Sequence, residues 1–317
     1  MDRRELAPWR VAVLGPGGIG GLLGALLARE GDDVVCLAPP ATAAQIAAHG
    51  LELRSSMLGD AKVAVRAATR LEEPVDVCFV TVKATQLERA VEAVPAGALG
   101  DGLVVPFLNG VDHVAWLRER YPPDQVVAGT IRIESTRVAP GVIEHDSPFA
   151  VVELAAGRAG RARGGSGGPG RPPRTDRVEE LARRLAATGL DVTVRDDEAF
   201  TLWSKLGILA PIALVTTWLA APLGQARASH RDEAVAVIRE IVQAARADGV
   251  ELDEAVATRI LDAAPASMRS SMQRDAEAGR PIELDAIGGA VLRAAARAGV
   301  DVPVTARLVA ELRARSG

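Results

Sequence analysis

The sequence is poor in aromatic residues, cysteine and histidine, and each scarcity narrows its interpretation. Aromatic residues make up 3% of the 317 residues, so leucine, valine, isoleucine and alanine must fill the core. The two cysteines, Cys36 and Cys78, are too far apart for a zinc or redox motif and predict buried, reduced thiols in a cytoplasmic protein. The four histidines are scattered without ligand spacing, so we expect no metal site.

A charge excess of one sign is also absent. The 37 basic residues against 41 acidic residues leave a net charge of −4, without the basic excess of nucleic-acid-binding proteins. With 48% hydrophobic and 25% charged residues, the composition is that of an ordinary soluble globular protein. The length predicts about two domains. We therefore expect a soluble protein with no nucleic-acid partner.

The longest uncharged segment, residues 206–226, has the length of a membrane span. A membrane-anchored protein and a buried core helix are the two interpretations. Pro211 and Pro222 interrupt the segment, Lys205 adjoins it and no second span accompanies it, which favours a buried helix and no membrane. The N-terminus carries both charge signs, and its first apolar run soon breaks into glycines, which predicts no signal peptide.

The first part of the chain alternates strand-like and helix-like segments, as a parallel sheet with crossover helices does. The expected strands are 10–14, 33–38, 75–82 and 103–108, and the expected helices are 22–30 and 86–94. Segments 126–135, 142–145 and 149–154 are expected to continue this sheet as antiparallel strands, followed by a helix at 178–188 and a strand at 191–194. The pattern predicts an α/β fold with a Rossmann-type doubly wound sheet.

Strand-like segments then stop, and apolar residues recur at helical spacing to the C-terminus. One helix is expected to start near Ser229 and end at Gly249. We therefore expect a sheet domain over residues 1–195 and an all-helical domain over 196–317. Within the first domain, residues 157–174 are almost purely Gly, Arg, Pro and Ser, which predicts a mobile loop. A solvated insertion is favoured over an anion-binding role for this loop.

A glycine-rich loop follows the first strand and precedes the first helix. Its sequence, Gly15-Pro16-Gly17-Gly18-Ile19-Gly20, matches G-x-G-x-x-G in the required context. Gly15 would permit the tight turn, Gly17 would let the backbone approach a pyrophosphate, and Gly20 would bring helix against strand. A dinucleotide site is favoured over a purely structural turn. The predicted cofactor-binding residues of the loop are Gly15, Gly17, Gly18, Ile19 and Gly20.

The type of dinucleotide is left open by these residues. The second strand ends in Ala38-Pro39-Pro40, without the acidic residue that binds the ribose hydroxyl of NAD or the arginine that holds the 2′-phosphate of NADP. Arg54, in the next segment, is the basic residue that could reach this position.

Polar side chains follow two of the predicted strands, at the edge where such sheets bind ligands. Lys83 follows strand 75–82, and Asn109-Gly110 follows strand 103–108. A solvated strand end is the alternative for Lys83. A simple turn is an equally favoured alternative for Asn109-Gly110.

Lysine is rare, since only Lys62, Lys83 and Lys205 occur among the 37 basic residues. Unlike arginine, lysine can give up its proton when its surroundings lower its pKa. Lys205 lies at the start of the long apolar segment, where desolvation would suit it to act as a general acid. A lysine that extends from a helix end into solvent is the alternative. Lys62 illustrates that a rare lysine need not be functional.

Taken together, these segments resemble the ketopantoate reductase family (2-dehydropantoate 2-reductases) over nearly the whole chain. The matching segments are the glycine loop, 81–86, 108–111, 202–206, 270–275 and 279–285. The resemblance implies an NADPH-dependent reduction of a 2-keto acid in a cleft between a Rossmann domain and a helical domain, in pantothenate biosynthesis. NADH is not excluded. The expected partner is a small-molecule 2-keto acid, and the sequence is compatible with a homodimer.

The resemblance also implies roles for individual residues. Lys205 would donate the proton to the developing alkoxide, and Glu283 would keep its ammonium charged and oriented. Ser271 would bind substrate, and Lys83 and Asn109 would line the cofactor and substrate cleft. For Glu283, a surface carboxylate at a helix start is the alternative.

The chain departs from the family at four positions. Leu209 and Ala213 stand where asparagines are common, Gly288 replaces a further asparagine, and Pro39 replaces the arginine that binds the adenosine phosphate. A site that cannot pair a substrate's polar groups rejects that substrate strongly, so the expected substrate is either 2-dehydropantoate, which is reduced to pantoate, or a related, less polar 2-oxo acid or ketone. A dinucleotide-binding sensor without turnover is the alternative function, although the presence of both predicted catalytic residues favours an enzyme.

Overall fold

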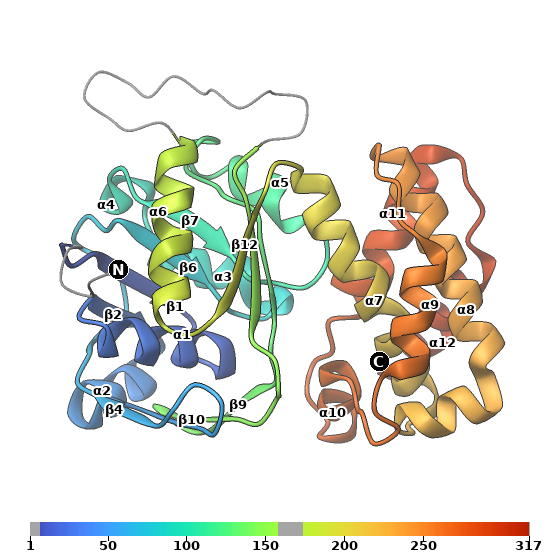
Figure 1. Cartoon of the computed structure of the whole chain (residues 1–317), viewed down its shortest axis with the longest axis horizontal. Helices are drawn as coiled ribbons and strands as arrows, with labels where there is room; N and C mark the ends of the chain where they lie inside the picture. The colour runs from blue at the N-terminus through green and yellow to red at the C-terminus, as the bar shows by residue number, and fades with distance from the viewer. Residues whose placement is uncertain (1–6, 158–173, 317) are drawn as a thin grey trace. The chain divides into compact units, whose positions relative to one another are not determined.

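The computed structural model describes residues 7–157 and 174–316. They form two compact units, one containing the residues up to 108 together with 113–198, the other containing 109–112 and the residues from 199 onward (Figure 1). The second unit thus includes a four-residue segment from within the range expected for the first domain. The loop predicted at 157–174 lies, apart from its two end residues, outside the described residues.

A five-stranded parallel sheet forms the centre of the first unit. Its strands are β1 (Arg10–Leu14), β2 (Asp33–Leu37), β5 (Arg66–Ala68), β6 (Val77–Val80) and β7 (Leu103–Pro106), in the order β5-β2-β1-β6-β7. The four expected strands are all present, with shorter bounds for three of them. The strand order reverses between β1 and β6, so the loops after these strands flank the position where open α/β sheets bind ligands.

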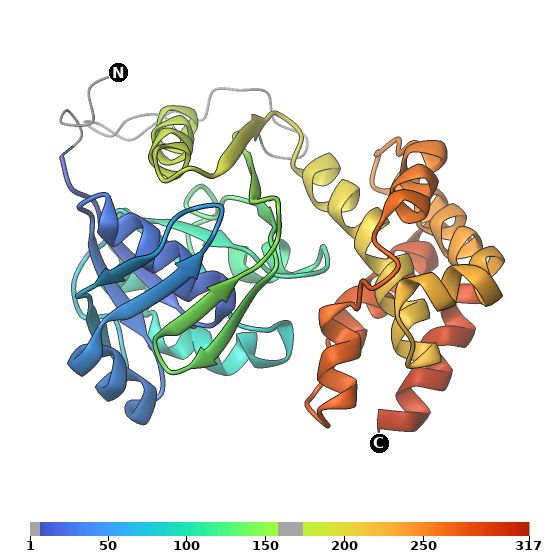
Figure 2. The same cartoon turned by 60° about the horizontal axis from the view of Figure 1, so that its bottom comes forward.

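Two smaller sheets accompany the first one. One joins β3 (Leu51–Ser55), β4 (Ala61–Val63), β9 (Ser135–Ala139) and β10 (Val142–His145); the other joins β8 (Gly129–Arg132), β11 (Val151–Ala155) and β12 (Asp191–Arg195). In Figure 2, blue β3 and β4 lie beside green β9 and β10. The prediction that the later strands continue the first sheet was wrong. Their β-branched residues indicate strands but do not specify which strand each one pairs with.

The helices of the first unit differ in length and regularity. They are α1 (Gly18–Arg29), α2 (Pro40–His49), α3 (Leu87–Ala90), α4 (Ala96–Leu99), α5 (His113–Arg118) and α6 (Arg174–Ala187), with 3₁₀ turns η1 (Ala84–Gln86) and η2 (Val91–Ala93). The continuous helix expected over 86–94 is therefore wrong, because η1, α3 and η2 divide that segment. Helix α1 begins at Gly18 rather than Leu22, so the last glycines of the loop form its first turn.

Helix α1 packs against the first sheet on one side and the second sheet on the other. A Cβ atom on Gly18 would lie 2.1 Å from the carbonyl oxygen of Ser135, and one on Gly21 would lie 2.6 Å from Ile143 Cδ1. Glycines spaced three apart share a helix face. Their missing side chains let β9 and β10 approach the helix backbone and fix its N-terminus.

The regular elements of the second unit are all helical in the part that the structure describes. Its elements are α7 (Glu198–Leu219, whose first residue belongs to the first unit), α8 (Leu223–Ala247), α9 (Glu254–Ala263), α10 (Ser271–Glu277), the π-helix η3 (Asp285–Gly289), α11 (Ala290–Ala298) and α12 (Pro303–Ser316). Helix α7 runs through Pro211 without a break, and Pro222 precedes α8. The expected helix start near Ser229 is instead a kink at His230, where φ is −140° within α8.

Helix α7 is the one helix, among the described residues, that is long and apolar enough to cross a membrane. However, 67% of its most apolar window is buried inside the protein. Trp203, Leu206 and Leu214 belong to the hydrophobic core of the second unit. This is the environment of a central core helix, the interpretation that the sequence favoured.

Candidate functional site

The glycine loop between β1 and α1 contains glycines that the fold requires and one that it does not. Gly15 has a φ of +86°, and a Cβ there would lie 2.5 Å from Val82 Cγ1. A Cβ on Gly20 would lie 2.4 Å from the carbonyl oxygen of Gly15. By contrast, a Cβ on Gly17 would meet nothing closer than that same oxygen, at 3.9 Å. A ligand close to the backbone explains glycine at this position, so the loop fits a dinucleotide pyrophosphate at the N-terminus of α1.

The segment after β6 is bonded to this loop. The hydroxyl of Thr81 donates hydrogen bonds to the carbonyl oxygens of Leu14, at 3.0 Å, and Gly15, at 2.8 Å. Lys83 follows two residues later, half-buried, immediately before η1. Lys83 therefore stands at the carboxyl edge of the parallel sheet, next in strand order to the glycine loop.

The end of β2 carries no charged side chain. Ala38 is buried, Pro39 is exposed, and α2 begins directly at Pro40. Arg54 is paired with Glu52 at 2.8 Å and with Glu144 at 3.2 Å, within the second sheet. The residues at this strand end thus select neither NADH nor NADPH.

In the second unit, two predicted site residues are hydrogen-bonded to each other. The Nδ2 atom of Asn109 donates to Oε2 of Glu283 at 3.1 Å, across 174 positions of sequence. Glu283 is only 7% exposed, so it is not the surface carboxylate of the alternative interpretation. Gly110 has a φ of +88°, and a Cβ there would lie 2.2 Å from the carbonyl oxygen of Ala286. The Asn109-Gly110 segment is therefore a turn that also presents its asparagine to a buried carboxylate.

Lys205 lies on α7 and is half-buried. Two residues earlier, the fully buried Trp203 donates from Nε1 to Oδ2 of Asp248 at 2.9 Å, which fixes this part of the helix. Leu209 and Ala213 follow the lysine at intervals of four and share its helix face. Ala213 is fully buried and Leu209 is half-buried. The face of α7 that carries the lysine is thus apolar where the family commonly has asparagine.

The start of α10 separates the roles of two adjacent serines. Ser270 is buried, caps α10 by accepting from the backbone N–H of Gln273 at 3.0 Å, and is hydrogen-bonded to the Thr216 hydroxyl of α7 at 2.9 Å. Ser271 is exposed at the first position of α10. Ser270 therefore anchors α10 to α7, whereas the predicted substrate-binding residue, Ser271, has an accessible hydroxyl.

Gly288 lies inside the helical core. A Cβ there would lie 2.4 Å from Val309 Cγ2 and 3.2 Å from Leu214 Cδ2. The asparagine that is common at this position in the family fits here only if the side chain of Val309 shifts.

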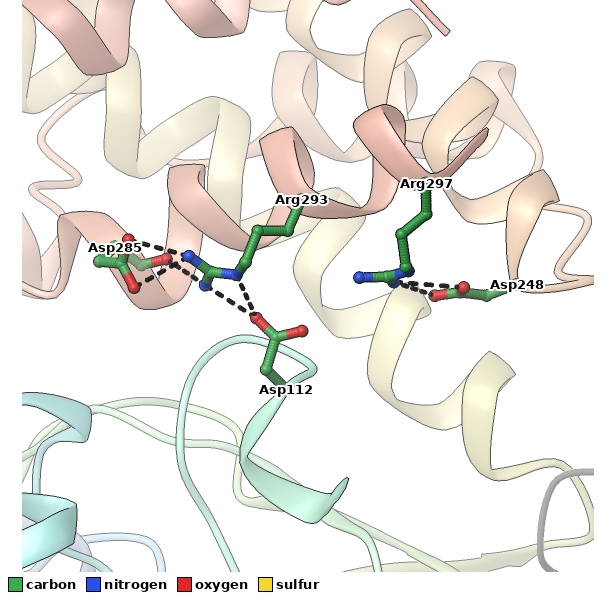
Figure 3. A network of polar contacts seen from close by, with 5 residues as sticks. All are labelled: Asp112, Asp248, Asp285, Arg293 and Arg297. Atoms are coloured by element: carbon green, nitrogen blue, oxygen red, sulfur yellow. Dashed lines mark hydrogen bonds and ion pairs between the residues drawn. The ribbon is translucent and has the colours of Figure 1, made fainter. Parts of the chain in front are cut away.

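Sequence reasoning missed an arginine that contacts a residue close to Asn109 and a residue close to Glu283. Arg293 of α11 donates to Oδ2 of Asp112 at 2.8 and 3.0 Å and to the carboxylate of Asp285 at 2.9 and 3.1 Å (Figure 3). Partial burial disfavours the charged guanidinium, but the hydrogen bonds to Asp285 and Asp112 outweigh it and raise the pKa of Arg293. Asp112 is 181 positions away, so no local pattern marks this arginine.

The cysteines and the possible metal ligands do not add to this site in the part of the chain that the structure describes. Cys36 on β2 and Cys78 on β6 are buried free thiols, and burial raises the pKa of each to about 12. Across residues 7–157 and 174–316, no three His, Cys, Asp or Glu side chains gather in a way that could hold a metal ion.

A Rossmann-type unit with a glycine loop, followed along the chain by a helical unit, defines a two-domain protein of the dinucleotide-binding class. Family models described as "Ketopantoate reductase PanE/ApbA" and "Ketopantoate reductase PanE/ApbA C terminal" match residues 11–156 and 200–316. The chain belongs to the ketopantoate reductase family.

Individual relatives match over nearly their full length. The chain is 29% identical to "Uncharacterized oxidoreductase YkpB" of Bacillus subtilis, over 95% of this chain and 96% of the relative. It is 28% identical to the 2-dehydropantoate 2-reductase of Caulobacter vibrioides, over 96% and 98%. A solved structure of D-mandelate dehydrogenase with NADH and anilino(oxo)acetate has a TM-score of 0.85 at 21% identity, covering 97% and 98%, which shows a shared fold.

Proposed function

We propose that this protein reduces a 2-keto acid to the 2-hydroxy acid with NADPH or NADH, by the chemistry of a 2-dehydropantoate 2-reductase. The observation that carries the proposal is the hydrogen bond from Asn109 to Glu283. It joins two residues that the family resemblance had assigned to one site. The carboxylate of Glu283 is buried, and a buried charged group needs hydrogen-bond partners such as Asn109.

The residues of the first unit would hold the cofactor, which supplies a hydride when bound. The backbone N–H groups at the start of α1 would donate to its pyrophosphate, and Gly17 leaves space for that approach. Lys83, at the adjacent strand end, would add a positive charge near the phosphates or the substrate carboxylate. NADPH follows from the family resemblance, and the uncharged end of β2 leaves NADH equally compatible.

The residues of the second unit would manage the proton and the substrate. The ammonium of Lys205 would protonate the oxygen of the reduced carbonyl as negative charge develops there. Glu283 would hold that ammonium charged and oriented, and Asn109 donates a hydrogen bond to Oε2 of the same carboxylate. Ser271 would hydrogen-bond the substrate through its accessible hydroxyl.

We further propose that the substrate is less polar than 2-dehydropantoate. Leu209 and Ala213 place hydrocarbon on the helix face of Lys205, and Gly288 is closed off by Val309. A hydroxyl facing such a wall would lose its hydrogen bonds on binding. A 2-oxo acid with an aliphatic or aromatic side chain suits the wall better. Both proposals are compatible with a cytoplasmic enzyme, since its thiols are buried and the apolar α7 is mostly buried.

The direct test follows NADPH and NADH oxidation with a panel of 2-oxo acids that includes 2-dehydropantoate. Lys205→Ala is expected to lower kcat by about 100-fold or more, with the Kd of the cofactor retained, because general acid catalysis is lost. Lys62→Ala is the matched control, since Lys62 is an exposed lysine on β4. Unchanged turnover in Lys205→Ala would remove this lysine from the mechanism. Cofactor binding without turnover of any substrate by the wild type would favour the sensor.

A further inference from the structure

One arginine, Arg293, binds an aspartate close to Asn109 and another aspartate close to Glu283. Asp112 lies three residues after Asn109, in the same turn, and Asp285 lies two residues after Glu283, at the start of η3. The guanidinium of Arg293 binds both carboxylates and also donates to the backbone carbonyl of Asp285 at 3.0 Å. We call this the Arg293 bridge, formed by Asp112, Arg293 and Asp285. Figure 3 shows the guanidinium between the two aspartates.

The turn at residues 109–112 therefore makes three contacts with the segment 283–293 of the same unit. Asn109 bonds Glu283, Gly110 closely approaches the carbonyl oxygen of Ala286, and Asp112 binds Arg293. Of the contacted residues, Ala286 lies in the π-helix η3, a rare element that is often found at functional sites, whereas Glu283 precedes η3 and Arg293 follows it in α11. Arginine can hold two carboxylates at fixed angles because its donors form a rigid planar fork.

We propose that Arg293 is a positioning residue, which holds the Asn109 turn against the start of η3 so that Asn109 orients the Glu283 carboxylate. The proposal rests on the proposed function for its kinetic consequence, but its geometric content is independent of turnover. Arg293 does not touch the reacting atoms in this account. It acts through Asn109 and Glu283.

The Arg293 bridge is too exposed to contribute much to the stability of the fold. The side chains of Arg293, Asp112 and Asp285 are 43%, 41% and 73% exposed, and ion pairs at such exposure contribute little to the stability of a fold. One turn further along α11, Arg297 is 53% exposed and contacts Asp248 at 3.4 Å (Figure 3). Arg297→Ala is therefore a matched control, and Asp248 keeps its hydrogen bond from Trp203 in that variant.

Asn109 is the single asparagine of the chain, which allows a direct test of its geometry. Labelling with [¹⁵N]asparagine gives one side-chain amide signal pair, and Glu283→Ala shows where the pair lies without its acceptor. Arg293→Ala is expected to move the signals toward that position, and Arg297→Ala to leave them unchanged. Asp112→Ala, which removes one arm of the bridge and adds no asparagine, is a milder second variant if Arg293→Ala does not fold. Unmoved signals in Arg293→Ala, or equal movement in both arginine variants, would overturn the proposal.

Kinetics then separate positioning from independent effects. Arg293→Ala is expected to lower kcat by about 10- to 100-fold with the KM of the cofactor unchanged, as for a small misplacement of a catalytic group. In the Asn109→Ala background, Arg293→Ala should lower kcat almost no further, because the side chain through which Arg293 acts is already absent. Arg293→Lys should restore part of the rate. Multiplicative losses in the double variant would contradict the proposal. A wild type with no turnover would refute the proposed function, and the amide signals alone would then decide the role of Arg293.

Discussion

Substitution of Gly17 should weaken binding of the cofactor without reducing the stability of the fold. Its backbone, with φ −82° and ψ −153°, is extended and open to alanine, and the nearest atom to an added Cβ is 3.9 Å away. Alanine at a helix N-cap costs roughly 0.5–1 kcal/mol relative to glycine-like caps. The lower entropy of the unfolded chain returns about 0.4–1 kcal/mol. Gly17→Ala is therefore expected to fold with nearly unchanged stability.

The cofactor should respond very differently. A methyl group forced into a close-packed contact costs about 1–3 kcal/mol, because neighbouring atoms must shift. If the pyrophosphate lies against Gly17, this corresponds to about a 5- to 150-fold increase in the Kd of NADPH or NADH. Calorimetric titration of the cofactor measures the Kd, and thermal unfolding without cofactor measures the stability.

Two further glycine substitutions act as controls. Gly97→Ala lies on α4 with no atom within 4 Å of the added Cβ, so it should leave cofactor binding unchanged and raise the stability by about 0.4–1 kcal/mol. Gly15→Ala should lower Tm, because its φ is +86° and Val82 occupies the space. An unchanged cofactor Kd in a folded Gly17→Ala protein would refute the placement of the pyrophosphate at this loop.

Two further predictions concern the buried interior. Gly288→Asn, which introduces the residue common in the family, should reduce stability by about 1–3 kcal/mol through overpacking against Val309 and should lower Tm, whereas a wild-type Tm would show that the core has room. Burial raises the pKa of Cys36 and Cys78 to about 12, so the thiolate form is scarce at pH 8. A thiol reagent should therefore modify neither cysteine in the native protein and both after denaturation. Fast labelling of the native protein would contradict the burial of the thiols.

The sequence predicts well those parts of the fold that depend on local signals. The strand at β1, the loop after it and the helical character of the C-terminal part follow from apolar periodicity and glycine spacing. Helix α2 was overlooked, although Pro40 at its first turn and Gly50 at its end are ordinary helix boundaries. The missed strands β4 and β5 are three residues each, too short for a periodic pattern to emerge.

Long-range pairing is what local signals cannot specify. The strands after residue 126 were recognised as strands, but their assembly into separate sheets depends on partners far away in the chain. The same limit applies to the candidate site. Family resemblance named Asn109 and Glu283, whereas Arg293 is one of many arginines, and only tertiary structure places it between Asp112 and Asp285.

The most direct measurement of the central claim follows the transferred hydrogen itself. NADPH, and separately NADH, carrying deuterium at both C4 positions of the nicotinamide is incubated with the protein and each 2-oxo acid of the panel, and the product is analysed by mass spectrometry. The account predicts a 2-hydroxy acid with one deuterium on C2, formed far more slowly by Lys205→Ala than by Lys62→Ala. A folded, cofactor-binding protein that forms no such product, or a product whose C2 hydrogen comes from solvent, would contradict it.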